Sequence, residues 1–297
     1  MRQWKGDTGG GTLGQRLLLV CFRLVDLRLG YAVMAIVVPF YMLFARQGYL
    51  SVYHYFRHRH GHSAWDAFRR TYRNHYLFGQ VILDRFAIYA GKSDAFEVEI
   101  VGNEHYERLA GGDKGFIIAG SHVGNFEIGG YLLHSYQKKI NALIYAGETE
   151  TVKRNRAAVM SGNNINLIPV REDMSHLFSV NSALQNGEIV SMPCDRKLGS
   201  TKSVECNFLG ARATFPIGAF ALAVSFGVEV LAVFCMKISS RKYRVTVSPL
   251  EEVNPLRTKA KKDLVNNLAQ SYVRRLEETV RQYPEQWFNF YEFWKQA

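Results

Sequence analysis

A change in the spacing of apolar residues near position 96 constrains the fold more than any other feature of the chain. From there on, short apolar runs alternate with segments that have helical spacing. The predicted strands cover residues 97–101, 115–119, 140–146, 165–170, 188–192, 229–235 and 243–247. Strands that alternate with helices favour a mainly parallel sheet flanked by helices. The sequence therefore predicts an α/β domain with a mainly parallel mixed sheet over residues 93–297.

The region before this domain has helical spacing and predicts a membrane-associating helical region over residues 15–92. Residues 29–45 carry no charge, which is the shortest stretch (about 17 residues) that crosses a hydrocarbon core. Cations flank this segment on both sides, so the charges choose no orientation. A span, a helix lying in the membrane surface and a buried core helix all remain open. Residues 1–14 are polar and glycine-rich, and predict a flexible arm.

The chain is strongly basic, with 37 Lys+Arg against 26 Asp+Glu and a formal charge of +11. This balance indicates an anionic partner, such as nucleic acid, anionic lipid or an acidic protein, although a merely basic soluble protein has the same composition. The cysteines, 4 in number, are scattered without a CxxC pair and predict reduced thiols, not a zinc site. Arginines interrupt the histidine run at 54–62, so we expect no metal there.

A histidine and an acid stand where the predicted strand 115–119 gives way to a helix. They are His122 and Glu127, with Asn125 between them. Active sites of open α/β sheets gather at the carboxyl ends of strands. A carboxylate that holds the imidazole in one tautomer equips it to remove a proton from a hydroxyl. The alternative is a histidine that only caps or packs.

Further polar blocks follow other predicted strands. Asn155 and Arg156 lie in a basic segment suited to a phosphate or an oxyanion, with a solvated helix as the alternative. Asp195 and Arg196 follow strand 188–192 and are predicted to contact substrate. Residues 208–218 predict an apolar loop that starts a helix, suited to the wall of an alkyl-chain slot or to ordinary packing.

Taken in order, these blocks resemble the bacterial lipid A late acyltransferases, within the lysophospholipid acyltransferase superfamily. The resemblance runs from about residue 12 to the end and closes with the Pro-x-Gln-aromatic block at residues 284–287. Two departures affect acceptor recognition. The loop after Pro193 lacks one of the usual acids, and residues 291–294 replace the usual basic ending.

The resemblance implies transfer of a fatty acyl chain from a thioester to a hydroxyl of a glycolipid or lysolipid acceptor. It gives His122 the role of general base without a covalent intermediate, and Glu127 that of orienting acid. It implies an acyl carrier protein or coenzyme A donor, no bound cofactor, and an anionic membrane lipid as partner. It also implies the cytoplasmic face of the bacterial inner membrane. The substrate-binding residues would be Asn125, Asn155, Arg156, Asp195 and Arg196.

Two other classes of function compete with this interpretation. One is a catalytically inactive lipid-binding or membrane-assembly protein of the same fold. The other is a nucleic-acid-binding protein, which we disfavour because the aromatic residues adjoin an apolar helix and no nucleic-acid module is present in the sequence.

Overall fold

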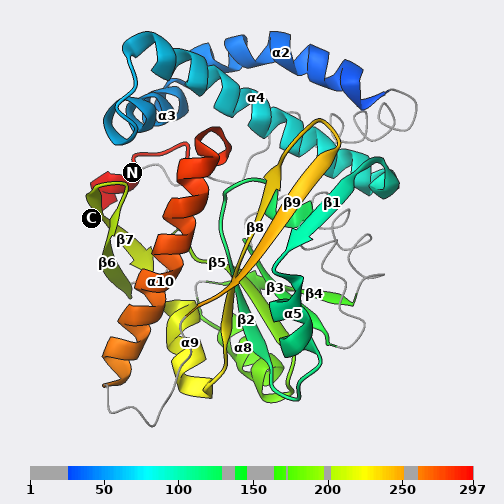
Figure 1. The fold of residues 1–297 in the computed structure, drawn as a ribbon, viewed down its shortest axis with the longest axis vertical. Coiled ribbons are helices and arrows are strands. Elements are labelled where there is room, and N and C mark those ends of the chain that lie inside the picture. Colours follow the sequence, from blue (N-terminus) through cyan, green and yellow to red (C-terminus); the bar gives the residue numbers. More distant parts are fainter. Residues whose placement is uncertain are drawn as a thin grey trace.

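A seven-stranded sheet with strand order β1–β9–β8–β2–β5–β3–β4 forms the centre of the molecule (Figure 1). The structure is a computed structural model and describes residues 26–128, 138–145, 164–171, 173–196, 202–250 and 260–296. Every neighbouring pair is parallel except β8–β9. The predicted mainly parallel sheet is thus confirmed. Its strands are β1 (Glu97–Val101), β2 (Phe116–Gly120), β3 (Ile140–Tyr145), β4 (Ile165–Val170), β5 (Ile189–Pro193), β8 (Val230–Lys237) and β9 (Lys242–Pro249).

Helices flank this sheet, as predicted. Figure 1 shows α2 and α4 crossing one end of the molecule, with α10 and α9 along one side of the sheet. The helices are α2 (Leu27–Phe44), α3 (Arg46–Arg59), α4 (Ala64–Tyr89), α5 (Asn103–Ala110), α8 (His176–Gln185), α9 (Gly218–Phe226) and α10 (Lys261–Gln282). Short 3-10 turns are η1 (Ser93–Ala95), η3 (Pro284–Gln286) and η4 (Phe293–Gln296). The arm predicted at residues 1–14 lies outside the described residues.

The central strands β2 and β8 are buried on both faces, which explains why they are almost continuously apolar. Adjacent residues of β2 point to opposite cores, Ile117 and Ala119 to one and Phe116 and Ile118 to the other. Every residue of β8 is buried. One core is covered mainly by α9 and α10, and the other by α2, α4 and α5.

The segment at residues 208–218, predicted as an apolar loop that starts a helix, leads into α9 as predicted, but most of it is not a loop. It belongs to an antiparallel hairpin of β6 (Ser203–Phe208) and β7 (Ala211–Pro216). The two-residue turn at Leu209 and Gly210 has φ of 51° and 75°, as hairpin turns of the right twist require. Phe208 and Phe215 are fully buried, so their rings belong to the core.

Candidate active site

The register of β2 against β5 brings His122 beside Asp195. The two parallel strands end at the pair Gly120–Pro193, and two residues further along each chain stand His122 and Asp195. The carboxylate accepts hydrogen bonds from the ring Nδ1 at 2.8 Å and from the backbone N–H of His122 at 2.9 Å. An ionised carboxylate only accepts, so Nδ1 carries the hydrogen and Nε2 has a free lone pair.

Glu127 contacts α4 instead of the imidazole, which differs from the sequence-based expectation. Its carboxylate lies 3.0 Å from the Arg85 guanidinium and accepts a hydrogen bond from the Tyr89 hydroxyl at 2.7 Å. The chain turns at Gly124 and runs beside β8, so that the following helical turn directs Glu127 to α4. The orienting acid in this structure is therefore Asp195, and a catalytic role for Glu127 stays a prediction.

The backbone around His122 is held from two sides. Gly124 has φ of 66°, and a Cβ there would lie 2.0 Å from the Cys235 carbonyl oxygen, so only glycine fits. The Asn125 N–H donates to that same carbonyl at 2.7 Å. On the other side, the Gly124 N–H donates to the Gln286 carbonyl at 2.8 Å, and the Phe288 N–H donates to the His122 carbonyl at 3.2 Å. These bonds fix the position of the imidazole.

The other predicted site residues lie at different distances from this centre. Asn125 is 1% exposed, and its side chain contacts the Tyr243 hydroxyl and the Ile128 N–H at 3.4 and 3.3 Å. It is a core residue in this structure, and its substrate contact stays a prediction. Arg196 donates to the Phe288 carbonyl beside residues 121–128, which we call the His122 loop. Asn155 and Arg156 lie outside the described residues.

The electrostatic surroundings suit a neutral imidazole. Burial and the Arg196 guanidinium lower the pKa of His122, although Asp195 acts in the opposite direction. Burial alone would raise the pKa of Asp195, but the His122 ring and Arg196 bring it below its ordinary value. At neutral pH the pair is an uncharged imidazole beside a carboxylate. That arrangement is able to accept a proton at Nε2.

Comparison with known proteins shows the family of the chain. The family model described as bacterial lipid A biosynthesis acyltransferase matches residues 76–296. The chain belongs to this family. It is an acyltransferase of lipid biosynthesis, and the sequence-based resemblance is confirmed.

Two further comparisons complete this picture. A search of the curated proteins gave no match. Among solved structures, the chain is similar to the 1-acyl-sn-glycerophosphate (LPA) acyltransferase PlsC from Thermotoga maritima, with 16% identity and a TM-score of 0.39. That similarity covers 82% of this chain and 98% of the other.

Several residues around the His122–Asp195 pair were not singled out from the sequence. Arg85 and Tyr89 come from α4, in the region predicted to be helical and membrane-associating. The Gln286 side chain accepts from the Lys237 N–H at 2.9 Å and donates to the Lys237 carbonyl at 2.8 Å. The resemblance flagged the block around Gln286, but no local pattern indicates that β8 is its partner.

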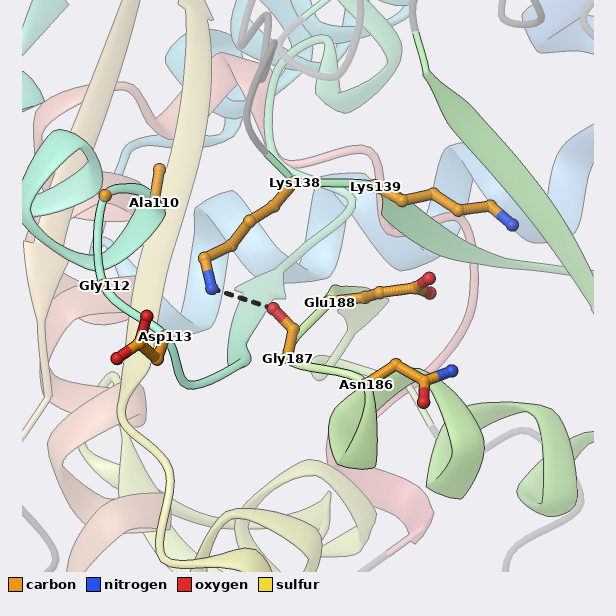
Figure 2. A pocket seen from close by; sticks show the side chains of 9 residues that line it. Ala110, Gly112, Asp113, Lys138, Lys139, Asn186, Gly187 and Glu188 are labelled. Atoms are coloured by element: carbon orange, nitrogen blue, oxygen red, sulfur yellow. Dashed lines mark hydrogen bonds between the residues drawn. The ribbon is translucent and has the colours of Figure 1, made fainter.

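A polar cavity of about 590 Å³ lies at the opposite end of the strands, where β2, β3 and β5 begin (Figure 2). Lys138 is buried there and donates to the backbone carbonyls of Lys114 and Gly187, both at 2.9 Å. The lysine thus satisfies main-chain acceptors at strand starts. Because His122 stands at the carboxyl end of β2, this cavity is separate from the His122–Asp195 pair.

Proposed function

We propose that this acyltransferase moves a fatty acyl chain from an acyl thioester to a hydroxyl of a glycolipid or lysolipid, with His122 as general base. The observation that carries the proposal is the contact between Nδ1 and Asp195. It leaves Nε2 as the basic nitrogen on a side chain that is 23% exposed, beside the exposed ring of Phe126. Glu127 supports the site through its contact with Arg85.

In the chemical step, this pair handles the proton. Nε2 removes the proton of the acceptor hydroxyl as its oxygen attacks the thioester carbonyl carbon. The tetrahedral intermediate then expels the thiolate, which takes the proton from the imidazolium and leaves as a thiol. A new ester bond replaces the thioester bond. Asp195 stabilises the imidazolium during the interval between these proton transfers.

A covalent acyl-cysteine intermediate has no support at this centre. Cys194 is next to Asp195, but its side chain is buried and its Sγ contacts the Met192 carbonyl oxygen at 3.5 Å. Burial raises the pKa of this thiol far above its usual range. A neutral buried thiol is a poor nucleophile, which supports direct transfer to the acceptor.

The basic composition supports our choice of partners. An acyl carrier protein is acidic, and so is an anionic bilayer surface, so a chain of charge +11 attracts both. We assign Arg156 and Asn155 to an acceptor phosphate or the oxyanion, with Arg196 at the substrate entrance. We place the enzyme at the cytoplasmic face of the bacterial inner membrane, with no resident cofactor.

Replacement of the proposed base tests the mechanism. His122→Ala should lower kcat by about 10²–10⁴-fold, because general-base catalysis contributes that much. Transfer of radiolabelled acyl chain to lipid measures the rate, and circular dichroism checks the fold. His105→Ala is the matched control, since that histidine is partly exposed on α5. Full activity of His122→Ala would refute the mechanism.

The donor is tested by supplying the same acyl chain on acyl carrier protein and on coenzyme A. We expect a higher kcat/KM with the carrier protein, because its acidic surface is attracted to the basic enzyme, and we expect that advantage to shrink as salt increases. Equal kcat/KM values at low salt would contradict the carrier-protein assignment while leaving the base unaffected.

A further inference from the structure

Helix α2 has two different faces. Its inner face includes Leu27, Tyr31, Val38 and Met42, which are all buried. Its outer face is apolar and exposed, and covers one side of the helix from end to end. Exposed fractions there are 58% for Leu29, 51% for Val33, 67% for Ile36, 60% for Phe40 and 89% for Phe44. An apolar surface of this extent indicates a partner.

The inner face of α2 packs along α4. The Tyr72 hydroxyl donates to the Ala35 carbonyl at 3.1 Å. Met34 lies so close to Gly79 that a Cβ at that glycine would be 2.3 Å from the Met34 Cε. Residue numbers increase along α2 as they decrease along α4, so the two helices are antiparallel neighbours.

Tyr31 ties α2 to the sheet as well. Its hydroxyl donates to the Asp84 carboxylate of α4 and accepts a hydrogen bond from Lys237 Nζ, the latter at 3.0 Å. Lys237 belongs to β8 and forms an ion pair with the same carboxylate. All three side chains are buried. Separating α2 from α4 would remove one partner of a buried charged cluster, which is costly.

A membrane-spanning α2 conflicts with this packing. The helix has 18 residues and a mean hydropathy of 1.8, which meets the length and composition for a span. A docked α2, however, would carry α4 into the hydrocarbon, including the exposed Arg69 and Arg73 and the ion pair of Arg85. Charged groups in the bilayer core are strongly unfavourable.

We infer that α2 lies flat in one leaflet, with its outer face against the acyl chains and both of its ends on the same side of the membrane. Figure 1 shows α2 on the outside of the molecule, with the sheet beyond α4. This inference rests on the proposed function, acyl transfer to a membrane lipid, and specifies how the enzyme attaches to the membrane. The partner that covers the apolar face of α2 is thus a lipid bilayer.

The rim of this face has the composition of a membrane interface. Trp65 and Phe68 at the start of α4 are exposed, and their rings stack with centroids 5.6 Å apart. Aromatic rings of this kind favour the headgroup level. The exposed cations Arg28, Arg46 and Arg69 complement anionic headgroups around it. A second copy of this basic chain would bring like charges together instead.

Thiol labelling of the full-length chain tests the inference. Cysteines are placed in the first turn of α2, just after α2 and on exposed α10 as Arg28→Cys, Arg46→Cys and Lys262→Cys, each with Cys21→Ser. The native Cys194, Cys206 and Cys235 are buried and should not react. A membrane-impermeant maleimide is added to inverted inner-membrane vesicles and to intact spheroplasts of a Gram-negative host.

We expect all three positions to react in inverted vesicles and none in spheroplasts. Labelling of residues 28 and 46 from opposite sides of the membrane would overturn the flat arrangement. It would not affect the proposed acyl transfer, which the activity assay of the wild type and His122→Ala tests separately. Recovery of every variant in the soluble fraction would overturn the attachment itself. Oxidative cross-linking of Phe40→Cys to a second copy would also overturn it, because the apolar face would then cover itself.

Discussion

Asp195 binds His122 at both the ring and the backbone N–H. Asp195→Asn removes a carboxylate that raises the pKa of His122, so that pKa should fall. A base works when neutral, so kcat/KM rises with pH through this pKa and then levels off. The acid limb should therefore move to lower pH in the variant, while the plateau falls about 100-fold because the tautomer is no longer held. A pH–rate profile measures both; an unshifted limb would contradict this assignment.

Glu127 should be coupled energetically to Arg85 and not to His122. Glu127→Gln leaves a partly buried guanidinium without its carboxylate, and the free energy of unfolding should fall by about 1–3 kcal/mol. Arg85→Met in the same chain should cost little more, because the pair is already broken. Chemical denaturation of both single variants and the double variant gives the coupling energy. Additive losses would contradict the pairing seen in the structure.

The sequence identified His122 but not the acid that orients it. Glu127 is the nearer acid along the chain, whereas Asp195 is 73 residues away and becomes a neighbour only because β5 lies beside β2. Strand order is a tertiary property that apolar spacing does not reveal. Asp195 was noticed because it follows a buried strand, which is the signal that remains available without that order.

At the scale of elements, η3 connects the His122 loop to β8 through Gln286. Gln286→Glu keeps the shape of the side chain but loses the amide N–H that donates to the Lys237 carbonyl. We expect the free energy of unfolding to fall by about 1–3 kcal/mol and kcat to fall with it, since the Gly124 N–H bonds to the same residue. Gln282→Glu, at an exposed position on α10, is the control. Unchanged stability and rate in Gln286→Glu would contradict this role.

The central strands β2 and β8 were predictable because burial on both faces makes them continuously apolar, and β9 because buried residues alternate along it. The hairpin β6–β7 was not, because β6 alternates with exposed polar residues such as Glu205 and Asn207. Its turn at Leu209 and Gly210 lacks the common Asn-Gly or Asp-Gly signal. The spacing of α2 indicated an apolar helix, but only its contacts with α4 distinguish a flat from a crossing arrangement.

At the scale of the whole molecule, the positive charge should govern attachment to anionic bilayers. Binding to vesicles that contain phosphatidylglycerol should weaken as salt increases, because screening reduces attraction between exposed charges. Arg69→Gln with Arg73→Gln should weaken it by about 1 kcal/mol per residue. The control is Arg274→Gln with Arg275→Gln on α10, which removes the same two positive charges at a distant site. Equal losses in both pairs would contradict a local attachment surface.

Helix α4 contacts both α2 and the His122 loop. One side of it packs against α2, and another supplies Arg85 and Tyr89 to Glu127. A helix with side chains is about 10 Å across. With α2 lying in the leaflet as inferred, the acceptor hydroxyl must lie roughly one helix diameter from the acyl chains to reach Nε2 of His122. The enzyme would then discriminate between acceptors by height, favouring lipids with tall sugar headgroups over those whose alcohol lies level with the glycerol backbone.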